Sequence, residues 1–371
     1  MRLSLTFLRY ISRVFLLSVL MMVASLSGLV ALFDFIELLR RAATKPEATF
    51  GIVSEIALLR IPWEAMQILP FAVLLGGIAA FWRLTRSSEL IVARATGLSA
   101  WQFLSGPMTV AFFLGALATG GVSPLAAVML ARAEALDQAY LQVGGGGPIS
   151  LAGGHLWLRQ ADHVLSPDGV AILHAEKVRG DHHRLEGEDV TVFRLTAHDA
   201  LLQRIDARAA RLEPGRWRLI EARLATTDRP PDPPAEMTLP TDLTVARVEE
   251  SFASPDTLSF WKLPRFISFL ERSGFSAIRH RLRLQSLLAL PVLSMTMTLV
   301  AAGFSMRPTR RGGTARMIGA GVASGFALFT ISKVAEEFGS SGGLPVVLAA
   351  WAPTASGLML AIALLLHLED G

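Results

Sequence analysis

The residues best suited to binding chemistry are a cluster of basic side chains at the end of the first long apolar run. The stretch FDFIELLRRAATK (33–45) carries Arg40, Arg41 and Lys45, and Glu37 precedes the two arginines by about one helical turn. A local ion pair with snorkelling side chains would account for this cluster. A basic rim that binds the anionic headgroup of a lipid would also account for it. The residues alone leave both interpretations open.

A second candidate is the charged stretch RLTRSSELIVARATGLSAWQF (83–103), which lies between two apolar runs. At about 100° per residue, apolar side chains share one helical face, interrupted by Arg94, and polar side chains occupy the other. The apolar face holds Leu90, Ile91, Ala95, Leu98 and Trp101, and the polar face holds Ser88, Glu89, Thr96 and Ser99. The pattern predicts an amphipathic helix at the membrane surface. Such a helix is either an interfacial elbow between two spans or a docking helix for a partner.

Signatures of catalysis and metal binding are weak or absent. The chain has no cysteine, which excludes disulfides and thiolate metal sites. The fragment DHH (181–183) lacks further ligands at the spacing of a metal site. The phosphate-binding loop G-x-x-x-x-G-K-[ST] is also absent, because no lysine follows a glycine at Lys45, Lys177, Lys262 or Lys333. We therefore predict a non-enzyme with no cofactor of its own, so that any ATP would be hydrolysed by another chain.

One further pair of charges lies near the end of the fifth apolar run. Lys333 and Glu337 are four residues apart, one helical turn. Ionisable residues inside a membrane are functional candidates by default. Here we predict a neutralised pair close to the membrane interface.

The composition of the chain is that of an integral membrane protein. Of its 371 residues 52% are hydrophobic and 18% charged, with a mean hydropathy of +0.46, whereas soluble domains have about a quarter charged residues. Apolar runs lie at 14–33, about 65–82, about 103–131, about 284–306, 317–336 and 345–366. Their length and continuity predict six transmembrane helices, the fifth of them short, rather than a barrel. The first run is too long for the apolar core of a cleaved signal peptide.

A polar region at about 141–253 separates the first three helices from the last three. Segments rich in β-formers lie at 155–160, 169–178, 188–196, 216–224 and 241–248, divided by Asp, Gly and Pro turns. This spacing predicts an all-β sandwich or open jelly roll. The expected organisation is therefore 1–140 with a surface helix at about 86–99, then a β domain at 141–253, then a re-entry helix and the last three transmembrane helices within 254–371.

The distribution of basic residues predicts the orientation of the helices. The more basic side carries Arg2, Arg9, Arg13, Arg83, Arg86, Arg94, Arg307, Arg310, Arg311 and Arg316, and the other side carries Arg40, Arg41, Lys45, Arg60 and Lys333. Cytoplasmic loops carry the excess of Lys and Arg. We therefore expect both termini and the 83–103 stretch in the cytoplasm and the β domain outside it. The net charge of +4 then follows from topology and does not indicate a nucleic-acid partner.

Four stretches together resemble a known family, the lipopolysaccharide-export permeases, which are the paired F and G subunits of the Lpt transporter. The stretches are SLSGLVALFDFIELLRRA (25–42), IPWEAMQILPFAVLLGGI (61–78), RSSELIVARATGLS (86–99) and LSFWKLPRFISFLERSG (258–274). The likeness is collinear over nearly the whole chain. The first helix and the SEL segment are more similar to the G-type members.

The resemblance implies a transporter of several chains in the bacterial inner membrane. A paired F-type permease would complete a heterodimer, and a cytoplasmic ATPase dimer would use ATP and Mg. The ATPase would dock on the helix after the second span, through Arg86, Ser88, Glu89, Arg94 and Gly97. The β domain would be a periplasmic jellyroll that passes lipopolysaccharide toward jellyrolls of a single-span protein and of a periplasmic bridge.

The resemblance also implies a substrate site at the outer end of the first helix. Arg40 and Arg41 match a basic pair that contacts the phosphorylated sugar of the lipid, and Asp34, Lys45 and Arg132 complete the expected set. Ala31 stands where G-type members carry a lysine, so Lys45 or Arg132 would compensate. Two alternatives remain: a permease for another lipid or lipoprotein, and a membrane-anchored β adaptor without a transport role.

Overall fold

The structure is a computed structural model that divides the chain into two compact units. It describes residues 5–45, 47–87, 89, 99–141, 149–152, 155–162, 169–181, 184–196, 200–226, 232–241, 243–244, 254–272, 275–305 and 314–369. A helical unit comprises Met1–Leu141, Pro255–Pro264 and Ile278–Gly371. A β unit comprises Gln142–Ser254 and Arg265–Ala277.

The described residues contain six helical segments long and apolar enough to cross a membrane, which confirms the predicted number. The helices are α1 (Leu5–Ala42), α2 (Phe50–Arg86), α4 (Ala100–Leu117), α5 (Ser123–Tyr140), α8 (Ile278–Ser305), α9 (Thr314–Ser340) and α10 (Val346–Glu369). A π turn, η1 (Ala118–Val122), joins α4 and α5 into the third span. The fifth span is not short: α9 has 27 residues and continues beyond Lys333, whose ammonium is paired.

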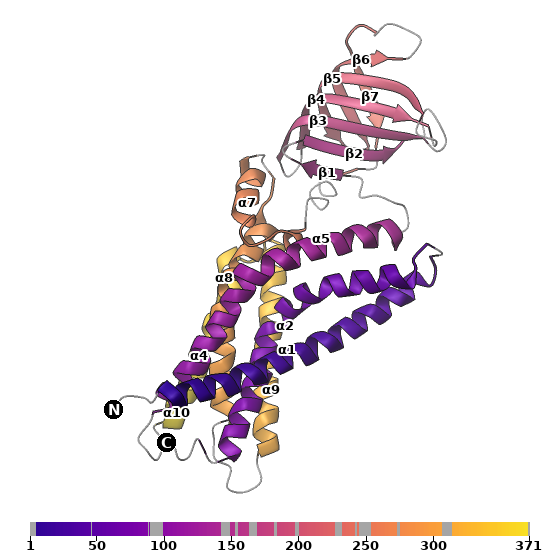
Figure 1. The fold of residues 1–371 in the computed structure, drawn as a ribbon. Coiled ribbons are helices and arrows are strands. Elements are labelled where there is room, and N and C mark those ends of the chain that lie inside the picture. Colours follow the sequence, from indigo (N-terminus) through magenta and orange to yellow (C-terminus); the bar gives the residue numbers. More distant parts are fainter. Residues whose placement is uncertain are drawn as a thin grey trace. The chain divides into compact units, whose positions relative to one another are not determined.

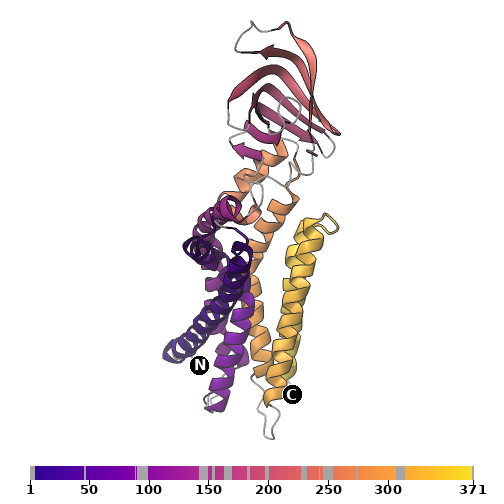
Figure 2. The same cartoon turned by 90° about the vertical axis from the view of Figure 1, so that its right-hand side faces the viewer.

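Helix α8 is the centre of the helical unit. It packs against α2, α4 and α10, and Figure 2 shows the purple helices of the N-terminal half on one side of it and the yellow α10 on the other. The main apolar core includes Phe15, Phe81, Leu104 and Met297. A Cβ atom at Gly115 of α4 would lie 2.5 Å from the Cα of Pro291 on α8, so glycine lets these two backbones approach closely.

A second apolar core joins the last turns of α1, the first turns of α2 and the later part of α5. It is built from Leu38, Val53, Ile56, Ala133 and Leu141. In Figure 1 these three helical segments run beside one another, and α2, which contains Pro62 and Pro70, changes direction along its length. This core holds in place the charged residues of α1, α2 and α5 described below.

The π turn is fixed by contacts from two other parts of the unit. The Thr119 hydroxyl donates to the Leu287 carbonyl of α8 at 2.8 Å. Trp261 Nε1 donates to the Gly120 carbonyl at 3.0 Å, and the Phe260 amide donates to Ser123 Oγ at 3.1 Å. Single π turns inside α-helices free backbone groups and often mark functional positions. Here the segment that precedes α8 binds the Gly120 carbonyl of the turn and Ser123, which follows it.

The β unit contains one antiparallel sheet in which the strands follow one another in sequence order (Figure 1). Its strands are β1 (Ile149–Ala152), β2 (His155–Ala161), β3 (Val170–Asp181), β4 (Arg184–Leu195), β5 (Leu201–Glu213), β6 (Arg216–Ala225) and β7 (Ala235–Pro240). The buried face includes Leu158, Leu173, Val192 and Trp217. The sheet is curved, so that its second and seventh strands meet: the side-chain amide of Gln160 on β2 donates to the Pro240 carbonyl of β7 at 2.9 Å. An inserted all-β unit is therefore confirmed.

Three of the strands differ from the sequence prediction. β1 and β5 were not predicted, and the last strand is β7 rather than a strand at 241–248. Thr241 follows β7, and its hydroxyl donates to Gln160 Oε1 at 2.7 Å instead of continuing the strand. Residues 245–248 lie outside the described part of the chain. The β unit also includes part of an amphipathic helix, α7 (Leu263–Arg272).

Two acidic residues with positive φ interrupt the alternation of buried and exposed side chains. Asp189 in β4 has φ 52° and Glu221 in β6 has φ 55°. Buried positions in β6 run through Trp217 and Leu219 but resume at Ala222, an even-numbered position. A bulge inserts one unpaired residue and exchanges the two faces of the strand beyond it.

Candidate functional site

Four charged residues from three helices form one network in the helical unit. Arg41 Nη2 lies 2.9 Å from Asp137 Oδ1. Arg60 reaches two carboxylates, with Nη2 at 3.5 Å from Asp137 Oδ1 and Nη1 at 3.1 Å from Asp34 Oδ1. Asp34 and Arg41 come from α1, Arg60 from α2 and Asp137 from α5. We call these residues the four-residue network.

Exposure increases in steps from Asp137 to Arg41. The side chain of Asp137 is 9% exposed, that of Arg60 20%, that of Asp34 22% and that of Arg41 33%. The apolar residues of the second core surround this place, with Leu38 and Ala133 within a turn of the charged positions. Buried charges require a paired and hydrogen-bonded environment. Asp137 is therefore the most buried member of the network, and Arg41 is the most exposed.

The remaining basic residues of the predicted substrate site lie outside this network. Arg40 pairs with Glu37 through bonds of 2.7 and 2.8 Å, and Arg132 pairs with Glu55 at 2.6 Å. Both pairs are exposed, with 75% of the Arg40 side chain and 67% of the Arg132 side chain accessible. Lys45 follows α1 and is partly exposed. Of the five predicted residues, the structure brings only Asp34 and Arg41 into the network.

Sequence reasoning missed the two residues that hold the network together. In the sequence, Arg60 stands out only as a basic residue of the less basic side, and nothing local distinguishes Asp137. Arg60 and Asp34 are separated by 26 positions, and Arg41 and Asp137 by 96. Asp137 is an acid within the third span, and a search for acids within the other spans that could pair with the arginines of α1 would have found it.

Glu64 is a further buried acid that sequence reasoning missed. It lies on α2, one turn after Arg60, and is 6% exposed. Its Oε2 atom has no hydrogen-bond partner among the described residues. Ionisable side chains inside membrane spans are functional candidates by default. Glu64 is therefore a further ionisable residue of α2, one turn further along the helix than the Arg60 of the network.

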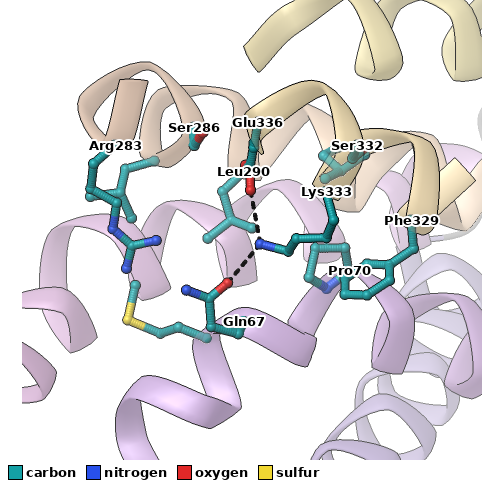
Figure 3. Close-up of a pocket in the computed structure, with 12 residues that line it drawn as sticks. Gln67, Pro70, Arg283, Ser286, Leu290, Phe329, Ser332, Lys333 and Glu336 are labelled. Carbon is teal, nitrogen blue, oxygen red and sulfur yellow. Dashed lines mark hydrogen bonds and ion pairs between the residues drawn. The ribbon is translucent and has the colours of Figure 1, made fainter. Parts of the chain in front are cut away.

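A separate polar hollow lies between α2, α8 and α9 (Figure 3). Lys333 Nζ lies 2.9 Å from Gln67 Oε1 and 2.9 Å from Glu336 Oε2, and 5.9 Å from the centre of the Phe329 ring. The predicted pairing of Lys333 with Glu337 is therefore wrong. Glu337 is exposed, whereas Glu336, three residues along, turns toward α2, where Gln67 completes the contact.

The size of this hollow limits what it can hold. Its volume is about 50 Å³, which suits one or two water molecules rather than a lipid. The hydroxyls of Ser286 and Ser332 line it and have no partner among the described residues. We interpret it as a hydrated contact between spans.

The segment that follows α2 begins the predicted docking helix. Ser87 Oγ donates to Glu89 Oε1 at 2.9 Å, and the Tyr10 hydroxyl of α1 donates to the same oxygen at 3.4 Å. The Arg86 guanidinium lies 5.4 Å from the centre of the Trp82 ring. Ser88, Arg94 and Gly97 lie outside the described residues. Ser99 then caps α4 in a capping box with Gln102.

The six spanning helices and the inserted antiparallel sheet define a multi-pass membrane protein with a folded β insertion between its third and fourth spans. The family model "Lipopolysaccharide export system permease LptF/LptG" matches residues 9–367. The chain therefore belongs to the LptF/LptG family of lipopolysaccharide export system permeases.

Curated relatives extend this comparison over almost the whole chain. The lipopolysaccharide export system permease protein LptG of Escherichia coli strain K12 is 24% identical over 367 residues, covering 97% of each protein. The LptG protein of Haemophilus influenzae is 22% identical over 362 residues, covering 93% of this chain and 94% of the relative. Both similar proteins are G-type permeases, which agrees with the G-like features of the sequence.

Proposed function

We propose that this chain is the G-type permease subunit of a lipopolysaccharide exporter in the inner membrane of a bacterium. The observation that carries the proposal is the family match across residues 9–367. Arg41 of the four-residue network supports it, because its guanidinium is a partly exposed cation at the end of a membrane span. Phosphates of a lipid headgroup are natural ligands for such a guanidinium.

The substrate site of this proposal consists of Arg40, Arg41, Lys45 and Arg132, with Asp34 in support. Arg40 and Arg132 are exposed and held by single carboxylates. Exposed ion pairs contribute only about 0–1 kcal/mol, so a phosphate with more than one negative charge can replace the carboxylate. The acyl chains then lie against apolar surfaces of the spans.

The route into the site is between the first span of one permease and the fifth span of its partner. The low burial of these two spans supports this route. Only 11% of the apolar stretch of α9 and 22% of that of α1 is buried within the chain, the lowest shares among the six spans. Their outer faces are therefore open to lipid or to an F-type permease, which would complete the heterodimer.

The energy comes from a separate cytoplasmic ATPase dimer, which uses ATP and Mg. The sequence of this chain lacks the phosphate-binding loop, and the ATPase docks on the segment at about 86–99, with Glu89 as its main contact. Closure of the ATPase moves this segment and the spans attached to it. The lipid then passes to the β unit, on the periplasmic side, and onward to the jellyrolls of the single-span and bridge proteins. Both termini face the cytoplasm.

The test is purification of the full-length chain from membranes of its own organism, with an affinity tag on the chain. We expect an ATPase, an F-type permease and lipopolysaccharide to elute with it, and ATP to drive release of the lipid to added bridge protein. Co-elution of a lipoprotein or another lipid in place of lipopolysaccharide would favour the alternative cargo. Co-elution without an ATPase would favour the adaptor role and overturn the proposal.

A further inference from the structure

We propose that Asp137 is an internal counter-ion that competes with the lipid phosphate for Arg41, and that Arg60 is the reserve cation that makes this exchange reversible. The inference deepens the proposed function and rests on it. It assigns roles to two residues outside the predicted substrate set. Both act through Arg41 and are positioning residues.

The first step is that Arg41 is already occupied. Its guanidinium has Asp137 as its acidic partner, with Nη2 at 2.9 Å from Oδ1. A phosphate that binds Arg41 must therefore remove it from a carboxylate that is 9% exposed. The affinity measured for the phosphate is then a difference between two ion pairs, and Asp137 lowers it.

The second step is that Asp137 does not become unpaired when Arg41 leaves. Arg60 Nη2 already lies 3.5 Å from the same oxygen, Asp137 Oδ1, while its Nη1 holds Asp34 at 3.1 Å. A buried carboxylate with no partner is strongly destabilising. Arg60 removes that penalty, because it can close on Asp137 as Arg41 turns outward.

The third step concerns which member of the network is free to move. Arg41 is 33% exposed, whereas Arg60 is 20% exposed and bound to two carboxylates. Arg41 is also in the last turn of α1, which ends at Ala42. The geometry therefore favours exchange at Arg41 while Arg60, Asp34 and Asp137 stay together.

The fourth step is the charge that remains. The network has two arginines and two aspartates and is neutral when complete. Once Arg41 is engaged by phosphate, Arg60, Asp34 and Asp137 retain one net negative charge. This charge repels the bound phosphate and favours its release. A transporter needs a site that binds its cargo and then gives it up, and this arrangement provides both.

The experiment measures binding of lipid A to the full-length chain in nanodiscs. The probes are lipid A with two phosphates and lipid A with both phosphates removed. The variants are Asp137→Asn, Arg60→Gln, Arg41→Gln and the double variant Arg41→Gln/Asp137→Asn. Glu337→Gln is the matched control, since it also removes one carboxylate charge from the helical unit, at an exposed position.

We expect Asp137→Asn to tighten binding of the phosphorylated lipid by roughly three- to tenfold. Arg60→Gln should weaken this binding by a similar factor, because Asp137 is then no longer shared with Arg60 and holds Arg41 more strongly. In the Arg41→Gln background the Asp137 substitution should have no effect. Glu337→Gln should match the wild type, and the dephosphorylated lipid should not respond to any variant.

Two results separate failure of this inference from failure of the proposed function. If Arg41→Gln weakens binding but Asp137→Asn and Arg60→Gln leave it unchanged, the counter-ion role is wrong and the substrate site stands. If Arg41→Gln and removal of the phosphates both leave binding unchanged, the substrate site itself is wrong. Should Asp137→Asn fail to fold, Arg60→Gln decides alone, because its expected effect has the opposite sign and retains Asp137.

Discussion

The hydroxyl of Thr119, in the π turn of the third span, donates a buried hydrogen bond of 2.8 Å to the main-chain carbonyl of Leu287 on α8. This bond fixes the turn to the central helix of the unit. The same turn receives Trp261 from the segment before α8. The third span is therefore held at its interruption and not only along its apolar faces.

Substitution Thr119→Val should lower the free energy of unfolding by about 1 kcal/mol, because it removes this hydrogen bond at nearly constant volume. Thr119→Ser keeps the donor and should recover most of the loss. Thermal unfolding of the detergent-solubilised chain measures both. Equal melting of the Val and Ser variants would show that the hydroxyl contributes nothing.

The β unit has its own buried ion pair. Arg194 binds Asp162 through two bonds, with Nη2 at 2.9 Å from Oδ1, and both side chains are nearly inaccessible. Asp162→Ala should destabilise the β unit by roughly 3–5 kcal/mol, because it leaves a buried guanidinium without its acid. The double variant Asp162→Leu/Arg194→Met should recover much of this loss. Denaturant unfolding followed by Trp fluorescence tests the pair, and a single variant within 1 kcal/mol of wild type would contradict it.

Glu89 provides a test of the docking role. Glu89→Lys reverses the charge next to Ser87 and Tyr10 and should abolish co-purification of the ATPase and lipid export. The ATPase activity of the isolated partner should not change. Tyr10→Phe, which removes only the 3.4 Å contact to Glu89, is the control for local disturbance. Full export by Glu89→Lys would exclude the docking role.

The basic pair at the end of α1 can be tested by photo-crosslinking. A photoreactive residue placed near Arg40 and Arg41 should crosslink to lipopolysaccharide, and the double change Arg40→Ala/Arg41→Ala should reduce the yield about tenfold or more. Arg208→Ala, which breaks an exposed pair with Glu221 on the β unit, is the matched control. Unchanged crosslinking and export in the double variant would rule out contact with the headgroup.

The β unit should also lose stability in acid. A hydrogen bond from Arg216 holds the pKa of Glu213 below its ordinary value, and Arg218 does the same for the pKa of Glu236. Both groups have lowered pKa values in the fold, so their contribution is complete above the unfolded pKa of about 4.3 and is lost as pH falls through the folded values. The effect is small, because the pairs are exposed. Denaturant midpoints of wild type and Arg218→Gln between about pH 6 and pH 3 should converge at the acid end; parallel curves would refute the assignment.

The spans were predictable because apolar runs are local signals. Their ends were not: the first run stops at Asp34 in the sequence, yet α1 continues to Ala42. The charges of its last turns are neutralised by Arg60 and Asp137, which lie on other helices. The pairing of charges between helices depends on tertiary packing, which a single sequence does not display. The same limit explains why Lys333 was assigned the wrong acid.

The strands show a second reason for failure. β5 was missed because its buried positions are occupied partly by alanines and change phase between Ala207 and Ala210. Alternation counts as evidence for a strand only while the phase is constant. Bulges at Asp189 and Glu221 break that phase in the neighbouring strands. The prediction of an all-β domain was nevertheless correct, because it depended only on the number and spacing of β-forming segments and not on each strand.

The π turn has a consequence for comparing this chain with distant relatives. A π turn contains about one residue more than the helix it interrupts, so every position after it is rotated by about 100°. Asp137 faces Arg41 and Arg60 only with that rotation included. In a relative with an uninterrupted third span, the position that faces these arginines would be displaced by about one residue, and an alignment without a gap near 118–122 would equate residues on different faces. At 22–24% identity, the helical geometry is the safer guide to which residues correspond.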